Sequence, residues 1–463
     1  MVNARPHQPG WLVAVVLGSA VFLALFDSTA VATALPAIGR ELEISSANLT
    51  WVVNAYSLGL GCFVLVGGRI ADLIGRRLTL VIGLSLLAAA SALAGTAPVF
   101  GVLLAARVLQ GVAAALALPA ALALTGQLFV QEPMRSRAFA VNAVAGSAAG
   151  LLGVIAGGTV TTVVGWRWIF LCAAVPAVLA VLAAIALLPR DAQKPRRRTL
   201  DLLGVALAAA GLAGVLYGLT SAGQEQPLHA WLPAAALGGA LLGLFVLRQV
   251  KATDPLLNLS LLRSPRTLGG SLGIAAHSAA YTAVSVIGSL QMQLAAGATP
   301  AQAGLLLSPV LVIVIIASAL IGPVLRRFGT RLIAGASLVL SGAALAVPAA
   351  VSSSAPLWAY GLALTVWAAL GGGINHVALT RETIGNAPSG QRGAISGIFE
   401  TATHIGGALA LAIYAGALAA GGFSAAYLWA IAFSVAGAAA VFLLIPRPSA
   451  RECDAAPGDR STP

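Results

Sequence analysis

Long apolar runs follow one another along the sequence, and this pattern constrains the fold more than any other feature. Of the 463 residues, 59% are hydrophobic and only 9% are charged, whereas soluble globular domains carry about 25% charged residues. A soluble chain could not bury so much apolar surface. Because a helix needs about 20 apolar residues to cross a bilayer, the runs predict an all-α integral membrane protein.

Fourteen of these runs are long enough to form transmembrane helices. They cover residues 11–34, 49–68, 78–97, 100–124, 138–160, 167–188, 201–220, 231–250, 267–290, 302–324, 331–351, 357–380, 392–418 and 424–445. With the N-terminus inside, all of the 26 Lys and Arg residues except Arg40, Arg107 and Arg167 lie on the inner side, as the positive-inside rule requires. We therefore expect a multi-pass membrane protein with both termini cytoplasmic.

A short internal repeat indicates how the helices are grouped. GRIADLIGRR (68–77) and GPVLRRFGTR (322–331) both fit Gly-x6-Gly-x-Arg, and both join two apolar runs on the inner side. The repeat relates spans 2–3 to spans 10–11, so two extra helices must separate two pseudo-symmetric six-helix bundles. Such paired bundles are a transporter architecture, with the substrate site at their interface.

This grouping predicts four regions along the chain. They are an N-terminal six-helix bundle (1–188), a basic loop with two extra helices (189–262), a C-terminal six-helix bundle (263–446) and a cytoplasmic tail expected to be disordered (447–463).

Ionisable residues inside the predicted spans are few, and such groups are functional candidates because their burial is costly. Asp27 lies about 24 Å into the first span and Arg107 about 10 Å into the fourth, which runs the opposite way. Both therefore fall in the outer half of the bilayer. We expect Arg107 to approach Asp27 and favour its ionised form while burial opposes it, a balance suited to a proton switch. A permanent structural ion pair is the alternative.

A second candidate proton site lies in span 13, where Glu400 and His404 are neighbours on one helix face. They could titrate together or bind a cation, or they could simply join span 13 to a neighbouring helix. No metal site is expected, because third and fourth ligands are missing. No cofactor is expected apart from protons as the coupling ion. His277 and His376 are further candidates within spans 9 and 12.

Several motifs resemble one known family. GRIADLIGRR resembles the loop 2–3 signature of the major facilitator superfamily. ARVLQGVAAALALPA (106–120) resembles the fourth-span signature of its proton-coupled exporters, with Arg107, Gln110 and Gly111 in the expected places. The segments WVVNAYSLGLGCFVLVGGRIAD, GWRWIFLCAAVP, GATPAQAGLLLSP and GQRGAISGIFETATHIGGALA are similar to its fourteen-span drug:proton antiporter branch.

The chain departs from that branch at two places. In span 5, Val154 replaces the proline of the antiporter signature, and in span 13 Glu400, Thr403 and His404 replace the usual amide and basic residue. Small residues in span 5 still share one helix face, which permits close helix packing. They are Gly146, Gly150, Gly153 and Gly157.

The resemblance implies proton-coupled export of lipophilic drugs or natural products, cationic ones included, by alternating access. Uptake or facilitated transport of a small metabolite is the alternative within transport. A membrane-embedded enzyme or sensor is the alternative from another class, which the absence of HExxH and Walker motifs disfavours. The expected partners are a small amphipathic organic substrate and the lipid bilayer, without nucleic acid, and the chain is expected to function as a monomer.

The resemblance also implies roles for two further sets of residues. The first is a cytoplasmic conformational latch, for which fixing the topology is the alternative: Asp72, Gly75, Arg76 and Arg77. The second set comprises substrate-binding candidates on the helices expected to line a cavity: Trp51, Asn54, Tyr56, Asn142, His277, Tyr281, Gln293 and Asn375.

Overall fold

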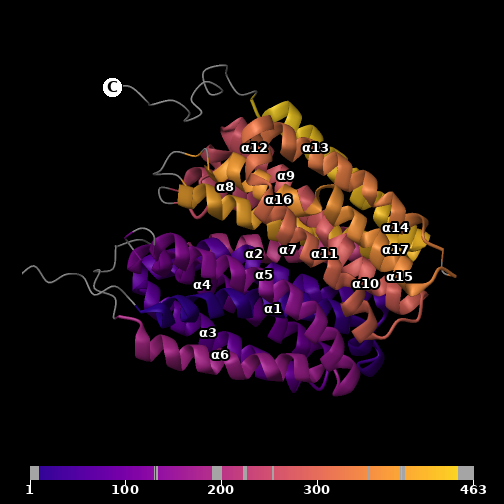
Figure 1. Cartoon of the computed structure of the whole chain (residues 1–463), viewed down its shortest axis with the longest axis horizontal. Helices are drawn as coiled ribbons and strands as arrows, with labels where there is room; N and C mark the ends of the chain where they lie inside the picture. The colour runs from indigo at the N-terminus through magenta and orange to yellow at the C-terminus, as the bar shows by residue number, and fades with distance from the viewer. Residues whose placement is uncertain are drawn as a thin grey trace, which may run out of the picture.

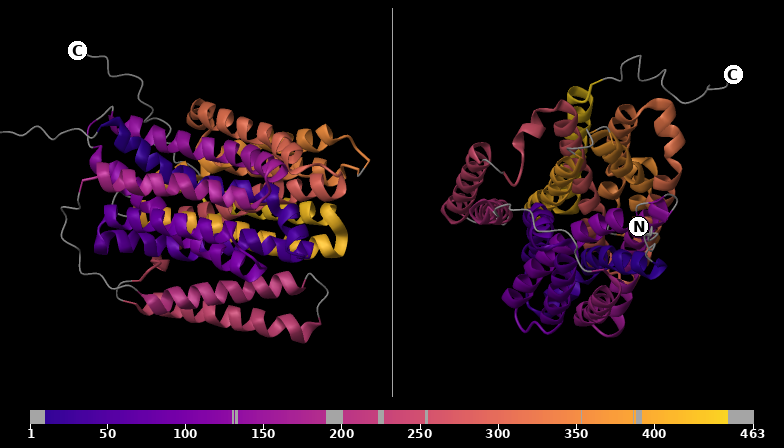
Figure 2. Two further views of the ribbon diagram at one scale, coloured as in Figure 1. Left: turned by 90° about the horizontal axis from the view of Figure 1, so that it is seen from below. Right: turned by 90° about the vertical axis from the view of Figure 1, so that its left-hand side faces the viewer.

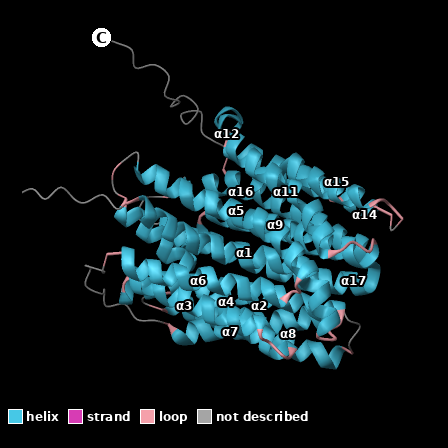
Figure 3. Ribbon diagram, turned by 60° about the horizontal axis from the view of Figure 1, so that its bottom comes forward, coloured by secondary structure: helices cyan, strands magenta, loops and turns pink. Residues whose placement is uncertain are grey.

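The structure is a computed structural model that describes most of the chain. The described residues are 10–129, 131, 134–189, 201–222, 227–252, 255–352, 354–385, 387 and 392–446. Within these ranges the fold is all helical, with no strand (Figure 3). The expectations for the N-terminal residues 1–9, most of the basic loop at 190–200 and the tail at 447–463 fall outside the described residues.

The first six helices form one group, drawn in indigo and purple in Figure 1. They are α1 (Trp11–Glu41), α2 (Ser46–Ile74), α3 (Arg76–Gly95), α4 (Phe100–Leu128), α5 (Met134–Val163) and α6 (Arg167–Leu187). Next come α7 (Leu202–Ala222) and α8 (Leu228–Lys251), followed by the short 3₁₀ turn η1 (Leu259–Arg263).

The remaining helices form a second group, drawn in orange to yellow, and several are interrupted by π-turns. One continuous helix comprises α9 (Pro265–Thr282), η2 (Ala283–Ile287), α10 (Gly288–Leu290) and η3 (Gln291–Ala295). After it come α11 (Pro300–Leu320), α12 (Gly322–Phe328), α13 (Thr330–Ala344) and α14 (Ala346–Ala350). The last are α15 (Leu357–Trp367), η4 (Ala368–Gly372), α16 (Gly373–Thr380), η5 (Arg381–Gly385) and α17 (Arg392–Leu444).

Among the described residues, 12 helices are long and apolar enough to cross a membrane, or up to 13 if α2 is counted as one span bent by 50°. The expected count of fourteen is therefore not reproduced by length and composition. One reason lies in α17, which is counted once although it covers two of the predicted runs. Gly422 interrupts α17 with non-helical dihedrals, φ 71° and ψ −163°, values that favour glycine because it lacks a Cβ.

The helices α7 and α8 pack against each other as a hairpin at the side of the molecule. Both views of Figure 2 place this hairpin outside the other helices. Its contact with the rest of the protein runs through α7, which lies against α2 and α17. Leu212 and Leu216 of α7 are buried there with Ala408 and Ala412 of α17.

Asp201, just before α7, links the beginning of α7 to the end of α8 through hydrogen bonds. Its carboxylate accepts hydrogen bonds from the Gly204 N–H (2.8 Å), Arg248 Nε (2.6 Å) and Gln249 Nε2 (2.9 Å). Burial raises the pKa of Asp201, but these hydrogen bonds outweigh burial and hold the pKa below its usual value.

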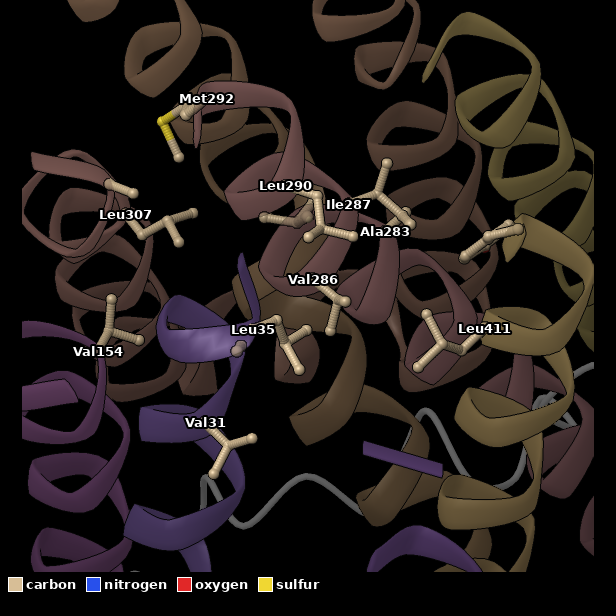
Figure 4. Packing of buried hydrophobic residues seen from close by; sticks show 14 of the residues in the cluster. Val31, Leu35, Val154, Ala283, Val286, Ile287, Leu290, Met292, Leu307 and Leu411 are labelled. Atoms are coloured by element: carbon tan, nitrogen blue, oxygen red, sulfur yellow. The ribbon is translucent and has the colours of Figure 1, made fainter. Parts of the chain in front are cut away.

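One hydrophobic core joins the two helix groups at the end of the molecule away from residues 10 and 446. It contains residues of α1 and α5 together with residues of α9 to α11 and α17, part of which Figure 4 shows. Hydrogen bonds cross the same junction: Ser289 Oγ donates to the Ala32 carbonyl (3.1 Å) and Gln293 Nε2 to the Thr33 carbonyl (3.0 Å). At the opposite end each group has a hydrophobic cluster of its own.

The span 5 glycines lie where α5 approaches its neighbours, but they are not equivalent. A Cβ on Gly153 would meet Thr29 Oγ1 at 2.0 Å, and one on Gly157 would meet the Ala30 carbonyl oxygen at 2.5 Å. A Cβ on Gly146 would lie 3.2 Å from Leu25, whereas one on Gly150 would lie an ordinary 3.7 Å from Leu311. Close packing of α5 on α1 therefore depends mainly on Gly153 and Gly157.

Candidate functional site

A cavity of about 460 Å³ lies between the two helix groups. Residues of α1, α2 and α5 line one side, and residues of α9, α11, α16 and α17 line the other. Its volume falls in the range of about 300–1,000 Å³ that small-molecule sites occupy. The lining combines aliphatic side chains with hydroxyl, amide and imidazole groups, a composition suited to an amphipathic organic molecule.

Arg107, which lines the cavity, forms a buried ion pair with Asp27 through Nη1 and Oδ2. Arg107 is 0% exposed and Asp27 1% exposed. The contact that helix depth predicted is therefore present in the structure. Its role in coupling stays a prediction.

Gln110 completes this ion pair from one turn further along α4. Its Nε2 donates to Asp27 Oδ1 (2.9 Å) and to Ser91 Oγ (3.0 Å), while its Oε1 accepts from Arg107 Nη1 (2.8 Å). Arg107 Nε also donates to the Val52 carbonyl (2.9 Å). Both charges thus have several partners, which a buried ion pair needs if it is not to be strongly unfavourable.

The ring of Tyr56 packs against the guanidinium of Arg107. The Arg107 guanidinium carbon lies 4.7 Å from the centre of the Tyr56 ring, a cation–π distance. The Tyr56 hydroxyl donates to the Ala24 carbonyl (2.7 Å). Tyr56 therefore lines the cavity with its ring, and its hydroxyl is already used in joining α2 to α1.

Glu400 and His404 lie together on α17, with Glu400 Oε2 3.9 Å from His404 Nε2. The Glu400 side chain is 44% exposed and His404 lines the cavity. His404 is therefore reached from the cavity, whereas Glu400 lies one turn away and is not among the lining residues. Thr403, next to them, lines the cavity and donates to the Phe399 carbonyl (2.9 Å).

Aromatic rings gather on the cavity side formed by the second helix group. His277 stacks on Trp367, with ring centres 6.0 Å apart and planes at 15°. His376 lies 6.2 Å from His277, and Tyr281 lies 6.2 Å from Trp367. His277, His376 and Tyr281 line the cavity, so the structure brings together histidines that come from different predicted spans.

Four of the substrate-binding candidates do not line this cavity, so for these residues the expected position is wrong in the present conformation. Trp51 packs with α7 and α17, because the hairpin covers that side of α2. Asn142 donates to Thr125 (3.0 Å) within the first helix group. Asn375 hydrogen-bonds Ser337 and Ser341 within the second. Gln293 lies at the junction between the groups and hydrogen-bonds Thr33.

The predicted latch residues surround the turn between α2 and α3. Gly75 adopts φ 102° at this turn, and Asp72 is exposed near the end of α2. Arg76 Nη1 donates to Gln127 Oε1 (3.0 Å) and to the Ala123 carbonyl (3.2 Å). Arg77 Nη2 donates to the Ile185 carbonyl (2.6 Å). These bonds connect helices of the first group, and the latch role stays a prediction.

Glu382 is a buried acidic residue that the sequence interpretation missed. Its carboxylate accepts from Thr330 Oγ1, and its Oε1 lies 3.8 Å from Arg266 Nε. The span predicted at 357–380 stops two residues before Glu382, but the helix continues through η5 and carries the side chain inward. In the Gly-x6-Gly-x-Arg repeat, Thr330 occupies the position equivalent to Arg76 of the first group. This equivalence is a sequence signal that marks the surroundings of Thr330, Glu382 included, as a candidate functional region.

Two groups of membrane helices with a cavity at their junction define the architecture of a secondary transporter. A profile described as "Major Facilitator Superfamily" matches residues 17–251 and 270–461. The chain belongs to the major facilitator superfamily.

Comparisons with individual proteins agree with this assignment. The puromycin resistance protein of Streptomyces alboniger is 39% identical over 270 residues, which are 58% of this chain and 52% of that protein. The lincomycin resistance protein of Streptomyces lincolnensis is 31% identical over 418 residues, 89% of this chain and 85% of that protein. A crystal structure of a POT family transporter in complex with 5-aminolevulinic acid matches with TM-score 0.70 and 12% identity, covering 95% of this chain and 98% of that one. This last likeness concerns the fold alone.

Proposed function

We propose that this protein exports lipophilic drugs or natural products, cationic ones included, across the bacterial cytoplasmic membrane, driven by inward proton movement. The observation that carries the proposal is the buried Asp27–Arg107 pair in the wall of the cavity between the helix groups. A carboxylate in that position can take up a proton only by giving up an ion pair, so its protonation changes the contacts of the cavity wall. The likeness to proteins named for puromycin and lincomycin resistance supports export of such compounds.

The coupling step follows from the hydrogen bonds around Asp27. A proton on Asp27 cancels its attraction to Arg107, while Arg107 keeps its bonds to Gln110 and to the Val52 carbonyl. Protonation therefore frees α1 from α4 without leaving the guanidinium unpaired, and substrate binding in the cavity favours release of that proton. Glu400 and His404 provide a second site for a proton or a cationic substrate group. No cofactor is required, and the protein acts as a monomer.

The proposed topology has fourteen spans, as two six-helix bundles with the α7–α8 hairpin between them, and both termini in the cytoplasm. Support for the count comes from α17, which at about 1.5 Å per residue would be about 80 Å long, far more than one crossing of a 30 Å core. The break at Gly422 divides it into two helices of spanning length. The distribution of Lys and Arg supports the orientation.

In this orientation the shared hydrophobic core faces the outside, and the structure corresponds to a state closed to the outside. Opening it requires separation of the Ser289–Ala32 and Gln293–Thr33 hydrogen bonds. The loop containing Asp72, Gly75, Arg76 and Arg77 then closes the cytoplasmic side as the latch. Alternating access is the exchange between these two arrangements.

Transport of ethidium into proteoliposomes with an acidic lumen tests the proposal. Wild-type protein should accumulate ethidium, and collapse of the pH gradient should abolish accumulation. Asp27→Asn should lose gradient-driven accumulation by at least tenfold while still exchanging ethidium. Glu41→Gln is the matched control, because Glu41 also pairs with an arginine, Arg167, but at an exposed position. Accumulation by Asp27→Asn at the wild-type level would contradict the proposal.

A further inference from the structure

Two polar side chains of the cavity wall are buried without a hydrogen-bond partner among the described residues. Asn54 on α2 is 0% exposed, and neither its Oδ1 nor its Nδ2 is bonded. His277 on α9 is 8% exposed, and its Nδ1 is not bonded. A buried polar group that stays unsatisfied is unfavourable. Both residues line the cavity, so a molecule that occupies it can supply the missing partners once it displaces the atoms that now cover them.

The two groups differ in what they can recognise. The Asn54 amide presents an acceptor beside a donor, and this pair matches a donor beside an acceptor on the edge of a planar ligand. His277 Nδ1 is a single polar atom on a ring whose plane is fixed by stacking on Trp367. Tyr281 and His277 both line the cavity and both pack against Trp367. A flat ring system therefore has aromatic neighbours on this side of the cavity that favour it over a flexible chain.

The charge around the cavity disfavours a simple cation site at this place. Arg107 lines the cavity but is paired with Asp27, and the described lining residues include no carboxylate. The other titratable groups that line the cavity are Tyr56, Tyr281, His376 and His404, and Glu400 lies one turn before His404 on α17. Recognition at Asn54 and His277 therefore rests on hydrogen bonds and stacking rather than on charge.

We infer that the cavity recognises planar heterocycles that carry a hydrogen-bond donor beside an acceptor on one edge, such as lactams, imides and nucleobases. The Asn54 amide hydrogen-bonds to that edge, and His277 Nδ1 hydrogen-bonds to another part of the ligand. This inference rests on the proposed function for the location of the site and adds the class of substrate. Because Asn54 and His277 belong to different helix groups, such a ligand bridges the two groups.

The test compares 1,8-naphthalimide with N-methyl-1,8-naphthalimide, which differ only at the imide nitrogen, N–H in the first and N–CH3 in the second. Equilibrium dialysis with the purified full-length protein in nanodiscs should give a Kd on the order of tenfold lower for the N–H compound. Asn54→Leu should reduce this ratio to about one. His277→Phe keeps the stacking but removes the nitrogen. It should therefore raise the Kd of both compounds by the same factor and leave the ratio of the two Kd values unchanged. Asn142→Leu, a buried asparagine outside the cavity, is the matched control and should change neither Kd.

The wild-type ratio needs no variant and is independent of any folding defect. Equal binding of the two compounds by wild type, absence of binding, or an unchanged ratio in Asn54→Leu would each overturn the inference. Ethidium has no imide edge, so its accumulation in proteoliposomes reports on the proposed function separately. Ethidium accumulation with equal naphthalimide binding would refute the inference alone, whereas the tenfold ratio without any accumulation would refute the export proposal alone.

Discussion

Gln110 donates a hydrogen bond from Nε2 to Oδ1 of Asp27 over 2.9 Å. The same side chain accepts from Arg107 (2.8 Å), so α4 holds the Asp27 carboxylate through two residues one turn apart. A carboxylate with two charge-assisted or amide donors is well satisfied only while it is ionised. An uncharged Asp27 would lose its attraction to Arg107, so we expect protonation of Asp27 to loosen the contact between α1 and α4.

Removal of Gln110 should impair coupling more than binding. A buried hydrogen bond to a charged group is worth about 1.5–3 kcal/mol, so Gln110→Leu should slow gradient-driven ethidium accumulation by roughly tenfold or more. Its ethidium Kd should stay within about twofold of wild type, because Gln110 does not line the cavity. Initial rates in proteoliposomes and dialysis with the same preparation provide both values. A parallel loss of rate and affinity would show that Gln110 acts through the binding site instead.

Gln293 should stabilise the state closed to the outside. Its hydrogen bond to the Thr33 carbonyl crosses between the helix groups, and a bond of about 1 kcal/mol corresponds to roughly a fivefold change in population. Gln293→Leu should therefore increase labelling of a Thr33→Cys probe by a membrane-impermeant maleimide about fivefold, in a background without native cysteines.

Gln291 provides the matched control for this measurement. It is also a buried glutamine of η3, but it bonds the Pro348 carbonyl (3.2 Å) and the Tyr427 hydroxyl (3.0 Å) within its own helix group. Gln291→Leu should leave the labelling rate of the Thr33→Cys probe unchanged. Equal acceleration by both variants would indicate general loosening rather than loss of a contact between the groups.

The glycines of α5 should differ in their tolerance of alanine. A Cβ at Gly157 would come 2.5 Å from the Ala30 carbonyl oxygen, which the backbone of α1 cannot easily move. Gly157→Ala should lower the free energy of unfolding by about 1–3 kcal/mol. Gly150→Ala, whose new methyl group would lie 3.7 Å from Leu311, should stay within about 0.5 kcal/mol of wild type. Thermal unfolding in detergent compares the two, and similar losses would argue against the close α1–α5 packing.

Asp201 should contribute a pH-dependent stability to the α7–α8 hairpin. Its folded pKa is lowered by bonds from Gly204, Arg248 and Gln249, which outweigh the opposing effect of burial. A lowered folded pKa means that the contribution is complete above the unfolded value of about 3.9. It is then lost as the pH falls through the folded pKa.

Replacement of Asp201 by asparagine provides the measurement. At pH 7, Asp201→Asn should destabilise the protein by about 1 kcal/mol, a modest value because Arg248 is 43% exposed and screened by solvent. The difference between wild type and variant should stay constant down to about pH 4 and shrink below it. A difference that grows on acidification would contradict the assigned interactions.

The contact between Asp27 and Arg107 could be predicted from the sequence because depth in the bilayer follows from residue count along a straight helix. The rotation of a helix about its axis could not be predicted in the same way. Several spans are apolar on all sides, so their periodicity does not show which face meets the cavity. Gln293 was expected to face the substrate for this reason, whereas packing against α1 directs it to Thr33.

Helix ends were the second source of error. The interpretation of span 12 ended at residue 380, but a π-turn extends the helix and buries Glu382 beside Thr330. By contrast, the break in α17 at Gly422 falls between the two runs predicted at 392–418 and 424–445. Apolar composition predicts where a chain crosses the membrane, but such local geometry depends on contacts between helices.

If Asp27 couples proton movement to transport, the Asp27–Arg107 pair opens when Asp27 takes up a proton. Infrared difference spectroscopy of the Glu400→Gln protein measures this directly through the C=O stretching band of a protonated carboxyl group. Acidification should raise a band that is missing when Asp27→Asn is added, and ethidium binding at fixed pH should remove the band and release protons. A band unaffected by Asp27→Asn, or no band over the pH range in which transport occurs, would contradict the account.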